Sequence, residues 1–380
     1  MAKILFFYPN NPLVVNQGNN ARAHALLHYF NSRGFTVDFV GIESNEFTDK
    51  HREEIQNSEL VRDAYLLPKR KNSGLNYLIR TSIVNKINKY PREFQWIYHN
   101  QEVYFTKILA KNTYDYVVIS YVHAFPLIKN KQALKNAVTI VDTHDFFTSQ
   151  YGTVDTPHLG NLFTTEMRLL AKFDHIWAIS VEEQFVFSQF LPNKSILTIP
   201  HGIQDRSQQR LPETSIDLFY VASDNPHNVE SAHWFFKEVH PLLPENINIT
   251  VVGKIQEQIG SYPNVTKIAY AENLDDFYRK SKVTLCPMLS GTGLKIKVVE
   301  SLAFGIPVVC NERGVDGLSS KVNNGCLVTD DPKEFASYII QLLDSDEFYN
   351  THKRYAHEFF NATLEASIVF KKLDQFFNPS

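Results

Sequence analysis

The chain has 380 residues, of which 43% are hydrophobic and 21% charged, and this length predicts two or three domains with an ample core. Its formal net charge of -3 excludes a general nucleic-acid binder, so no nucleic-acid partner is expected. The three cysteines show neither CxxC nor Cys/His spacing, which indicates buried thiols in a reducing compartment rather than disulfides or a zinc site. No stretch approaches the length of a membrane span, and the apolar start is too short for a signal-peptide core, so we expect a cytoplasmic protein.

The first half of the chain alternates between short apolar runs typical of strands and segments with apolar residues at helical spacing. A polar loop over 9–20, which includes Gly18, precedes a helix expected over 21–33 and ended by Gly34. Seven strands are predicted in this half, over 4–8, 36–41, 64–67, 116–120, 138–141, 175–179 and 196–199. This alternation predicts a parallel α/β sheet.

A second α/β series follows a polar stretch at 204–215, where we place a linker between two domains. Six strands are predicted in this part, over 218–221, 249–252, 265–268, 283–286, 307–310 and 326–328. The predicted domains are therefore 1–203 and 216–362, followed by a final helical segment in 363–380. Because ligands of parallel sheets lie beyond the carboxyl ends of the strands, two such sheets facing each other would define one cleft.

The most informative segment is 290–317, with the sequence SGTGLKIKVVESLAFGIPVVCNERGVDG. Gly291 and Gly293 flank Thr292, so the backbone can adopt a positive φ and approach a ligand closely. The helix expected to open at these glycines presents unpaired N–H groups and the positive end of its dipole, which favour an anion. An ordinary loop, helix and strand with surface charges is the alternative interpretation.

That helix carries a cation and an anion on one face, since Lys297 and Glu300 are three residues apart. Gly305 is expected to end the helix, and 306–310 has the apolar character of a short interior parallel strand. The G-x-G-x-x-G fingerprint of NAD-binding domains is absent because Ile296 stands at the third glycine position.

The segment 290–317 resembles the donor-site motif of the family 4 (group 1) glycosyltransferases, which have the GT-B fold. Other segments resemble further motifs of this family in the same order, at 9–12 with 17–22, 114–118, 173–180 and 199–203. The first of these corresponds to a loop whose glycine-containing turn lies close to the donor's phosphates. The resemblance implies an α/β architecture of two Rossmann-like domains facing a central cleft, with the helix in 363–380 packing back on the N-terminal domain. The N-terminal domain would then hold the acceptor, and the C-terminal domain would bind the nucleotide sugar.

The resemblance also implies roles for the residues of the donor site. Lys297 would offset the charge of the leaving diphosphate, and Glu300 would accept hydrogen bonds from ribose hydroxyls. Many members of the family carry a glutamate where this chain has Thr292. The expected donor-binding residues are Gly18, Lys254, Gly291, Thr292, Gly293, Leu294, Lys297 and Glu300. No cofactor is expected beyond the donor substrate, a nucleotide-diphosphate sugar, and no metal site is expected.

His144 is the expected catalytic residue, because it follows the strand 138–141 at the place where a cleft residue belongs. In related enzymes a histidine here lies near the acceptor hydroxyl, and Asp142 or Asp145 could orient its ring. The alternative is a histidine engaged in local hydrogen bonds of the turn. Weaker candidates on the acceptor side are Asn20, His123 and Asp145.

Residues 67–92 contain seven basic residues, no acidic residue and interleaved apolar side chains. Such a stretch can lie on an anionic membrane surface, and related enzymes that extend lipid-linked sugars use a patch of this kind. A helix that faces the core and has a solvated basic side fits the pattern equally well. Peripheral contact with the inner face of the membrane is therefore one of two open interpretations.

These features predict a glycosyltransferase that moves a sugar from a nucleotide-sugar donor to a hydroxyl of a glycan or lipid-linked glycan acceptor. The resemblance implies retention at the anomeric carbon and a place in bacterial surface polysaccharide or lipopolysaccharide assembly. Two alternatives stay open: a nucleotide-sugar 2-epimerase-like enzyme of the same fold, and a non-catalytic relative that binds a partner.

Overall fold

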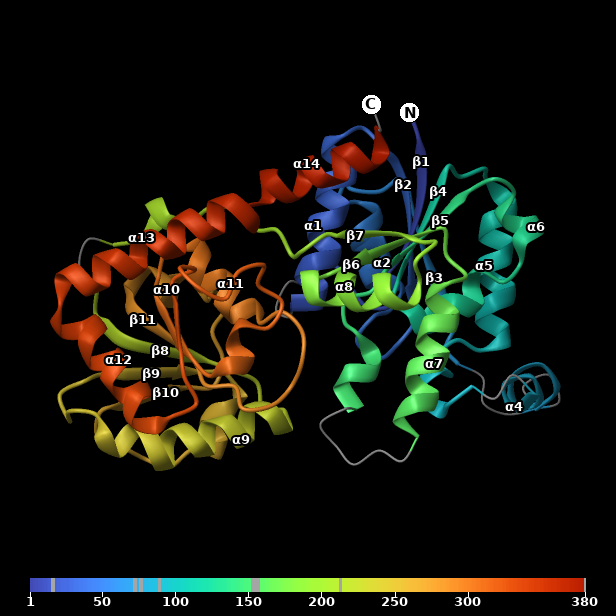
Figure 1. Ribbon diagram of the computed structural model, residues 1–380. Coiled ribbons are helices and arrows are strands. Elements are labelled where there is room, and N and C mark those ends of the chain that lie inside the picture. The colour runs from blue at the N-terminus through green and yellow to red at the C-terminus, as the bar shows by residue number, and fades with distance from the viewer. Residues whose placement is uncertain are drawn as a thin grey trace. The chain divides into compact units, whose positions relative to one another are not determined.

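Figure 1 shows the computed structural model, which describes residues 1–14, 18–70, 74, 78–87, 90–151, 158–211 and 214–378. Within 78–87 the side chains of residues 80, 81, 84 and 85 lie outside the described part. The chain divides into two compact units, Met1–Ile199 and Pro200–Ser380. Each unit is built around one parallel β-sheet.

The first unit has a seven-stranded sheet in the order β3-β2-β1-β4-β5-β6-β7, in which every neighbouring pair is parallel. Its strands are β1 (Lys3–Phe7), β2 (Thr36–Ile42), β3 (Asp63–Leu67), β4 (Tyr116–Ser120), β5 (Val138–Asp142), β6 (His175–Ala178) and β7 (Ser195–Thr198). The central strands β1, β4 and β5 are buried beyond their first residues, as expected for a parallel sheet covered on both faces.

Helices lie on both sides of this first sheet, and Figure 1 shows α1 (Gly18–Ser32) on one side and α5 (His99–Lys111) on the other. The further helical segments of the unit are α2 (Asp49–Gln56), η1 (Leu78–Ile83), α4 (Val84–Ile87), η2 (Arg92–Phe94), η3 (Val122–Ile128), α6 (Lys131–Leu134), η4 (Phe147–Tyr151), α7 (Leu159–Leu170) and α8 (Val181–Phe190). The aromatic and aliphatic side chains between helices and sheet form the core of the unit.

The second unit has a six-stranded sheet in the order β10-β9-β8-β11-β12-β13, again parallel throughout. Its strands are β8 (Ile216–Val221), β9 (Ile249–Val252), β10 (Val265–Ile268), β11 (Ser281–Cys286), β12 (Val308–Cys310) and β13 (Cys326–Val328). Its helical segments are η5 (Ser207–Gln209), α9 (Pro226–Trp234), η6 (Phe235–Val239), η7 (His240–Leu242), η8 (Lys254–Gln258), α10 (Asp275–Lys280), α11 (Ile296–Ala303), η9 (Glu312–Val315), α12 (Pro332–Asp344), α13 (Asp346–Thr363) and α14 (Ala366–Phe377).

The strand order reverses once in each sheet, between β1 and β4 in the first unit and between β8 and β11 in the second. Ligands of open α/β sheets bind beyond the carboxyl ends of the strands at such a reversal. The fold therefore points to one candidate site in each unit.

Every predicted strand is present, with ends that differ by at most two residues. The prediction of a loop at 18–20 is wrong, because α1 begins at Gly18 and places Asn20 in its first turn. Glycine and asparagine are poor residues for a helix interior, but in the first turn the N–H groups are unpaired in any case. The helix expected to open at Gly291 and Gly293 begins later, at Ile296.

All three cysteines are buried and free, as predicted from their spacing. Within the described ranges, no helix has the length and apolar character needed to cross a membrane. The final helix expected in 363–380 is α14. Its return to the N-terminal domain, the linker at 204–215 and the central cleft stay predictions.

Candidate functional site

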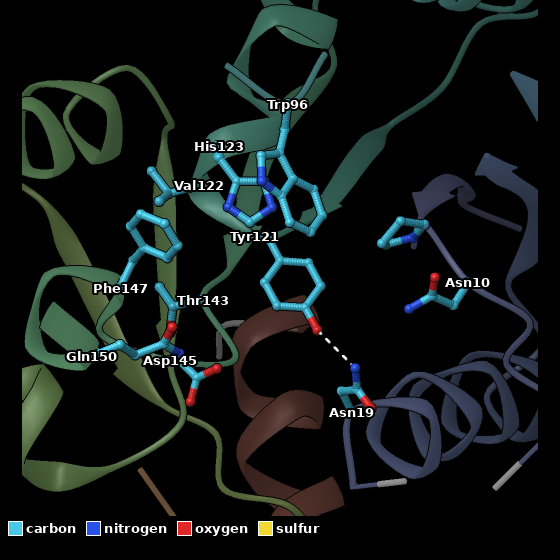
Figure 2. A pocket seen from close by; sticks show the side chains of 11 residues that line it. Asn10, Asn19, Trp96, Tyr121, Val122, His123, Thr143, Asp145, Phe147 and Gln150 are labelled. Carbon is cyan, nitrogen blue, oxygen red and sulfur yellow. Dashed lines mark hydrogen bonds between the residues drawn. The ribbon is translucent and has the colours of Figure 1, made fainter. Parts of the chain in front are cut away.

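At the carboxyl ends of β4 and β5, the first unit contains a cavity of about 180 Å³. Aromatic rings and short polar side chains line it: Pro9, Asn10, Asn19, Trp96, Tyr121, Val122, His123, Thr143, Asp145, Phe147 and Gln150. Figure 2 shows Trp96, His123 and Tyr121 next to one another, with Asp145 on another part of the wall. Flat apolar faces combined with a few polar groups are typical of a small-molecule site.

A buried ion cluster lies at the end of β5. Arg22 of α1 places its Nε 3.0 Å from each carboxylate oxygen of Asp142, and both side chains are almost completely buried. His144 Nε2 lies 3.0 Å from Asp142 Oδ2. Burial alone would raise the pKa of Asp142, but the charge of Arg22 and the contact with His144 hold it well below its usual range. Of the two carboxylates predicted to orient His144, Asp142 contacts its ring.

His144 is the centre of an aromatic stack. The centre of its ring lies 4.4 Å from the centre of the Tyr121 ring and 5.7 Å from that of the Tyr8 ring, and both rings are nearly parallel to it. His144 and Tyr121 have positive φ angles of 59° and 69°, a conformation that non-glycine residues seldom adopt. Such backbone conformations persist where the surroundings enforce them and cluster at ligand sites. The packing thus fixes the His144 ring at the end of β5.

His123 continues the stack toward the cavity, with its ring 5.1 Å from Tyr121 and 4.0 Å from Trp96. Burial, together with the charges of Arg70 and His144, lowers the pKa of His123 to about 3, so the ring is neutral at physiological pH. Neither ring nitrogen has a hydrogen-bond partner among the described residues. A neutral imidazole offers one donor and one acceptor, which suits a ligand hydroxyl.

The two asparagines at the start of α1 have different environments. Asn20 is buried, and its amide accepts from the Tyr8 hydroxyl at 2.6 Å and donates to the Val14 carbonyl at 2.7 Å. Asn19 lines the cavity and donates to the Tyr121 hydroxyl at 3.2 Å, as Figure 2 shows. Burial raises the pKa of Tyr8 to about 12, so it stays protonated as the donor to Asn20. The amide exposed to the cavity is therefore that of Asn19, while Gly18 lies in the same first turn.

In the second unit, the glycine turn before α11 has the conformation that the sequence predicts. Gly291 and Gly293 have φ angles of 88° and 79°. Lys295 donates from its Nζ to the carbonyl of Gly293 at 2.8 Å, which ties the turn to the helix start. A Cβ on Gly317 would lie 3.0 Å from the Cα of Leu294, so this glycine allows close packing against the turn. Thr292 is half-buried between the two glycines.

Lys297 and Glu300 lie half-buried on α11. Lys297 donates to Asn228 Oδ1 at 3.2 Å, and its ammonium lies 5.6 Å from the centre of the Tyr220 ring. Glu300 accepts from the Tyr278 hydroxyl at 2.9 Å. Burial lowers the pKa of Lys297 and raises that of Glu300, because it disfavours both charged forms.

The start of α9 packs beside the glycine turn. His227 Nδ1 lies 2.8 Å from Ser290 Oγ, and a Cβ on Gly291 would lie 3.4 Å from the His227 ring. Lys254 follows β9 and is exposed, after Gly253 with a φ of 109°. Since β8, β9 and β11 are parallel neighbours, the segments that carry these residues leave the same edge of the sheet.

Sequence reasoning missed several residues of both sites. Trp96, Tyr121, Asn19, Arg22, Asn228 and Tyr278 were not predicted to take part. Asn19, Arg22 and Tyr121 lie within two residues of the candidates Gly18, Asn20 and His123. Trp96, Asn228 and Tyr278 come from segments far from the motif that they support, so no local spacing could have singled them out. In the part of the chain that the structure describes, no group of three or more His, Cys, Asp and Glu side chains could hold a metal ion.

Comparison with known proteins gives a family for part of the chain. Residues 215–345 match the family model of the group 1 glycosyl transferases. An uncharacterised 44.6 kDa protein in the cps region of Klebsiella pneumoniae is 20% identical over 367 residues, which is 90% of each chain.

Solved structures resemble the chain over its full length. A sucrose-phosphate synthase from Thermosynechococcus elongatus matches with a TM-score of 0.73 and 16% identity, over 99% of this chain and 98% of that one. HepE of Anabaena, in complex with UDP and glucose, matches with a TM-score of 0.71 and 12% identity over 100% of both chains. A mutant of TarM from S. aureus, in complex with fondaparinux, alpha-GlcNAc-glycerol and UDP, matches with a TM-score of 0.71 and 13% identity over 100% of both chains. At these identities the likeness shows the fold.

The family match covers the glycine turn, Lys297 and Glu300, which are the residues that carry the predicted resemblance. The structural matches extend over both parallel sheets. Both parts of the prediction are confirmed at this level: residues 215–345 match the group 1 glycosyl transferases, and the chain has the GT-B fold of two parallel α/β domains.

Proposed function

We propose that the protein transfers a sugar from a nucleotide-diphosphate sugar to a hydroxyl of a glycan or lipid-linked glycan, with retention at the anomeric carbon. The observation that carries this proposal is the turn and helix at 291–303. Two glycines with positive φ precede a helix start, and Lys297 and Glu300 follow with neutral hydrogen-bond partners. Such a start binds phosphate through its N–H groups and dipole.

Each donor residue has a distinct task in this proposal. Lys297 lies half-buried, where its charge is weakly screened, and offsets the negative charge that grows on the leaving diphosphate. Glu300, held by the Tyr278 hydroxyl, accepts from hydroxyls of the nucleotide ribose. Thr292 and the N–H groups of Gly293 and Leu294 contact the sugar or the phosphates, with Lys254 and Gly18 on the phosphate side.

The cavity of the first unit suits the acceptor. Trp96 offers a flat face for a sugar ring, and Asn19, Asp145 and the unpaired nitrogens of His123 offer hydrogen bonds to its hydroxyls. His144 positions the incoming hydroxyl. The acceptor oxygen bonds to the anomeric carbon while the bond from that carbon to the diphosphate breaks, and the acceptor proton passes to the leaving diphosphate.

The biological setting is proposed from two observations. The relative from Klebsiella pneumoniae belongs to a cps region, which supports a role in surface polysaccharide assembly. Four large apolar side chains between 78 and 87 are exposed, namely Leu78, Ile79, Ile83 and Ile87. Apolar side chains beside basic ones suit the surface of an anionic membrane, so we propose peripheral contact there, at the cytoplasmic face.

The experiment that tests the donor site measures nucleotide-sugar binding. A thermal-shift screen over nucleotide-diphosphate sugars identifies the donor, because a ligand that binds only the folded chain raises its melting temperature. Calorimetry with that donor should then show that Glu300→Ala abolishes measurable affinity. The exposed residues Glu347 and Lys353 on α13 provide matched controls, since Glu347→Ala and Lys353→Ala should leave affinity unchanged.

Unchanged affinity in Glu300→Ala would defeat the donor assignment. Product analysis with and without acceptor glycans then tests the reaction itself. Transfer requires the acceptor, whereas a 2-epimerase-like enzyme releases its products without one. A chain that neither transfers nor slowly hydrolyses the bound donor is a non-catalytic relative.

A further inference from the structure

Two buried carboxyl groups hold the loop that follows β5, residues 143–148. Glu183 of α8 is 5% exposed and Glu166 of α7 is 0% exposed. The loop carries His144, and Figure 2 shows its Thr143 and Asp145 on the cavity wall. Neither glutamate lines the cavity, so each acts on the site through the loop.

The contacts of Glu183 have the lengths of ordinary neutral hydrogen bonds. Phe146 N–H lies 3.0 Å from Oε1, while the Thr143 hydroxyl and Ile179 N–H lie 3.1 and 3.4 Å from Oε2. The single hydrogen of the Thr143 hydroxyl faces a second acceptor, because the Trp177 carbonyl oxygen is also 3.1 Å away. A proton on Glu183 satisfies both contacts, since its O–H then donates to Thr143 and Thr143 donates to Trp177.

Glu166 has a different set of contacts, made only of donors and shorter. It accepts from Phe147 N–H at 2.9 Å, from Thr148 N–H at 2.7 Å and from the Thr148 hydroxyl at 2.6 Å. Hydrogen bonds to an ionised carboxylate have these short lengths. An ionised carboxylate accepts a hydrogen bond from all three donors, whereas the O–H of a protonated Glu166 would point at one of these donors.

The charges around the loop agree with this assignment. Asp145 of the loop acts on both glutamates, and the groups that face Glu183 from the β6 side, the Trp177 carbonyl and Ile179 N–H, are uncharged. At the start of the loop, ionised Asp142 is already compensated by Arg22 and His144.

Burial and the charge of Asp145 raise the pKa of Glu183 to about 8. Burial also raises the pKa of Glu166, to about 7, against the effect of its hydrogen bonds from Thr148 and Phe147. The higher pKa of Glu183 agrees with its contacts, because Glu183 keeps its proton to a higher pH than Glu166.

We propose that Glu183 in its protonated form and Glu166 in its ionised form are positioning residues that fix the loop 143–148 for sugar transfer. This inference rests on the proposed function, because the loop carries His144 and places Asp145 on the cavity wall. When Glu183 loses its proton, the Thr143 hydroxyl turns from the Trp177 carbonyl to the new anion, and that carbonyl loses this bond and keeps the one from the Thr143 N–H at 3.0 Å. Transfer should therefore weaken at alkaline pH.

The test compares the same substitution at the two sites. Glutamine reproduces the donor and acceptor pattern of a protonated glutamate, so Glu183→Gln should keep kcat within about twofold at pH 7. Its transfer rate should lack the fall above pH 8 that the wild-type protein shows. Glu166→Gln places an NH2 group against N–H or O–H donors in either orientation, so kcat should fall about tenfold or more. Donor KM should change little in both variants, because the donor residues lie elsewhere in the chain.

A second readout needs neither donor nor acceptor. Glu183 binds its proton up to pH 8 in the folded chain but only up to its ordinary value of 4.5 when unfolded, so it makes stability fall as pH rises through this window. The melting temperature of Glu183→Gln should therefore rise relative to wild type between pH 5 and 8. Infrared spectra recorded from pH 6 to 9 should show that the carbonyl band of a protonated carboxylic acid persists to a higher pH in wild type than in Glu183→Gln.

The outcomes separate this inference from the proposed function. If the infrared band and the melting temperatures behave as expected but no sugar is transferred, the proton assignment stands and the proposed function fails. If transfer occurs but Glu183→Gln is as impaired as Glu166→Gln, or does not fold, the inference is overturned. An infrared band that persists to the same pH in Glu183→Gln as in wild type overturns it as well.

Discussion

The two candidate sites are assembled in different ways. In the second unit, the glycine turn, Lys297 and Glu300 belong to one continuous segment. In the first unit, Arg22 and Asp142 meet across 120 positions of the sequence, and the aromatic stack joins residues from three strand ends. One site is therefore encoded locally, while the other exists only once the sheet has formed.

Their electrostatics differ in the same way. The charges of Arg22 and Asp142 compensate each other inside the core, so this ion pair holds α1 and the end of β5 in place. Lys297 donates to a neutral amide and Glu300 accepts from a neutral hydroxyl, while the charges of Arg206 and Lys297 act on Glu300 through space. Charges that are matched internally fix geometry, and charges with neutral partners are available to a ligand.

The largest expected effect comes from breaking the buried ion pair between Arg22 and Asp142 in the first unit. Arg22→Met leaves the carboxylate of Asp142 buried with only His144 beside it, which should cost about 3–5 kcal/mol of unfolding free energy. Urea denaturation at pH 7 measures the loss. The difference should shrink in acid, because without Arg22 the pKa of Asp142 is no longer held low and the carboxylate takes up a proton.

The control for this variant removes both charges together. Arg22→Met combined with Asp142→Leu leaves no buried charge of the pair, so the double variant should recover most of the loss. A single variant that loses less than about 1 kcal/mol would mean that this pair behaves like an exposed salt bridge, whose contribution is in that range.

The same contrast explains what the sequence could predict. The strands, the glycines before α11 and the shared face of Lys297 and Glu300 follow from spacing within a few residues, and all are confirmed. Trp96 and Tyr121 line the cavity because η2 and β4 end near each other in space, which no local pattern encodes. Motif position led to His144, but its ring partners Tyr8 and Tyr121, which follow β1 and β4, required the fold.

A smaller effect is expected where a close approach within the second sheet is blocked. Gly253 has a φ of 109°, and a Cβ there would lie 2.2 Å from the carbonyl oxygen of Ala222. Gly253→Ala should therefore cost about 1–3 kcal/mol, since a backbone atom cannot move aside as a flexible side chain could. Gly160→Ala on α7 is the matched control, because a Cβ there meets nothing within 4 Å.

Thermal unfolding of the two glycine variants checks this prediction. Gly160→Ala should be neutral or slightly stabilising, as alanine is favoured over glycine within a helix. Equal melting temperatures for both variants would contradict the steric argument and imply that the segments after β8 and β9 can separate at little cost.

The smallest expected effect tests whether local rules act equally in both units. Helices α1 and α11 end in the same motif. After α1, the N–H of Gly34 donates to the Asn31 carbonyl and the next N–H donates to the Phe30 carbonyl. After α11, the N–H of Gly305 donates to the Leu302 carbonyl and the next N–H donates to the Ser301 carbonyl. Gly34 and Gly305 have φ angles of 73° and 65°, and a Cβ on either meets no atom closer than 3.7 Å. Alanine at either position should thus lower the free energy of unfolding by about 1 kcal/mol from backbone strain alone.

Urea midpoints measured side by side for the two variants should shift by similar amounts, because neither cost depends on the sheet beyond the helix. A clearly larger loss for Gly305→Ala would show that the end of α11 is coupled to the rest of its unit, and that the second site is less local than its sequence implies.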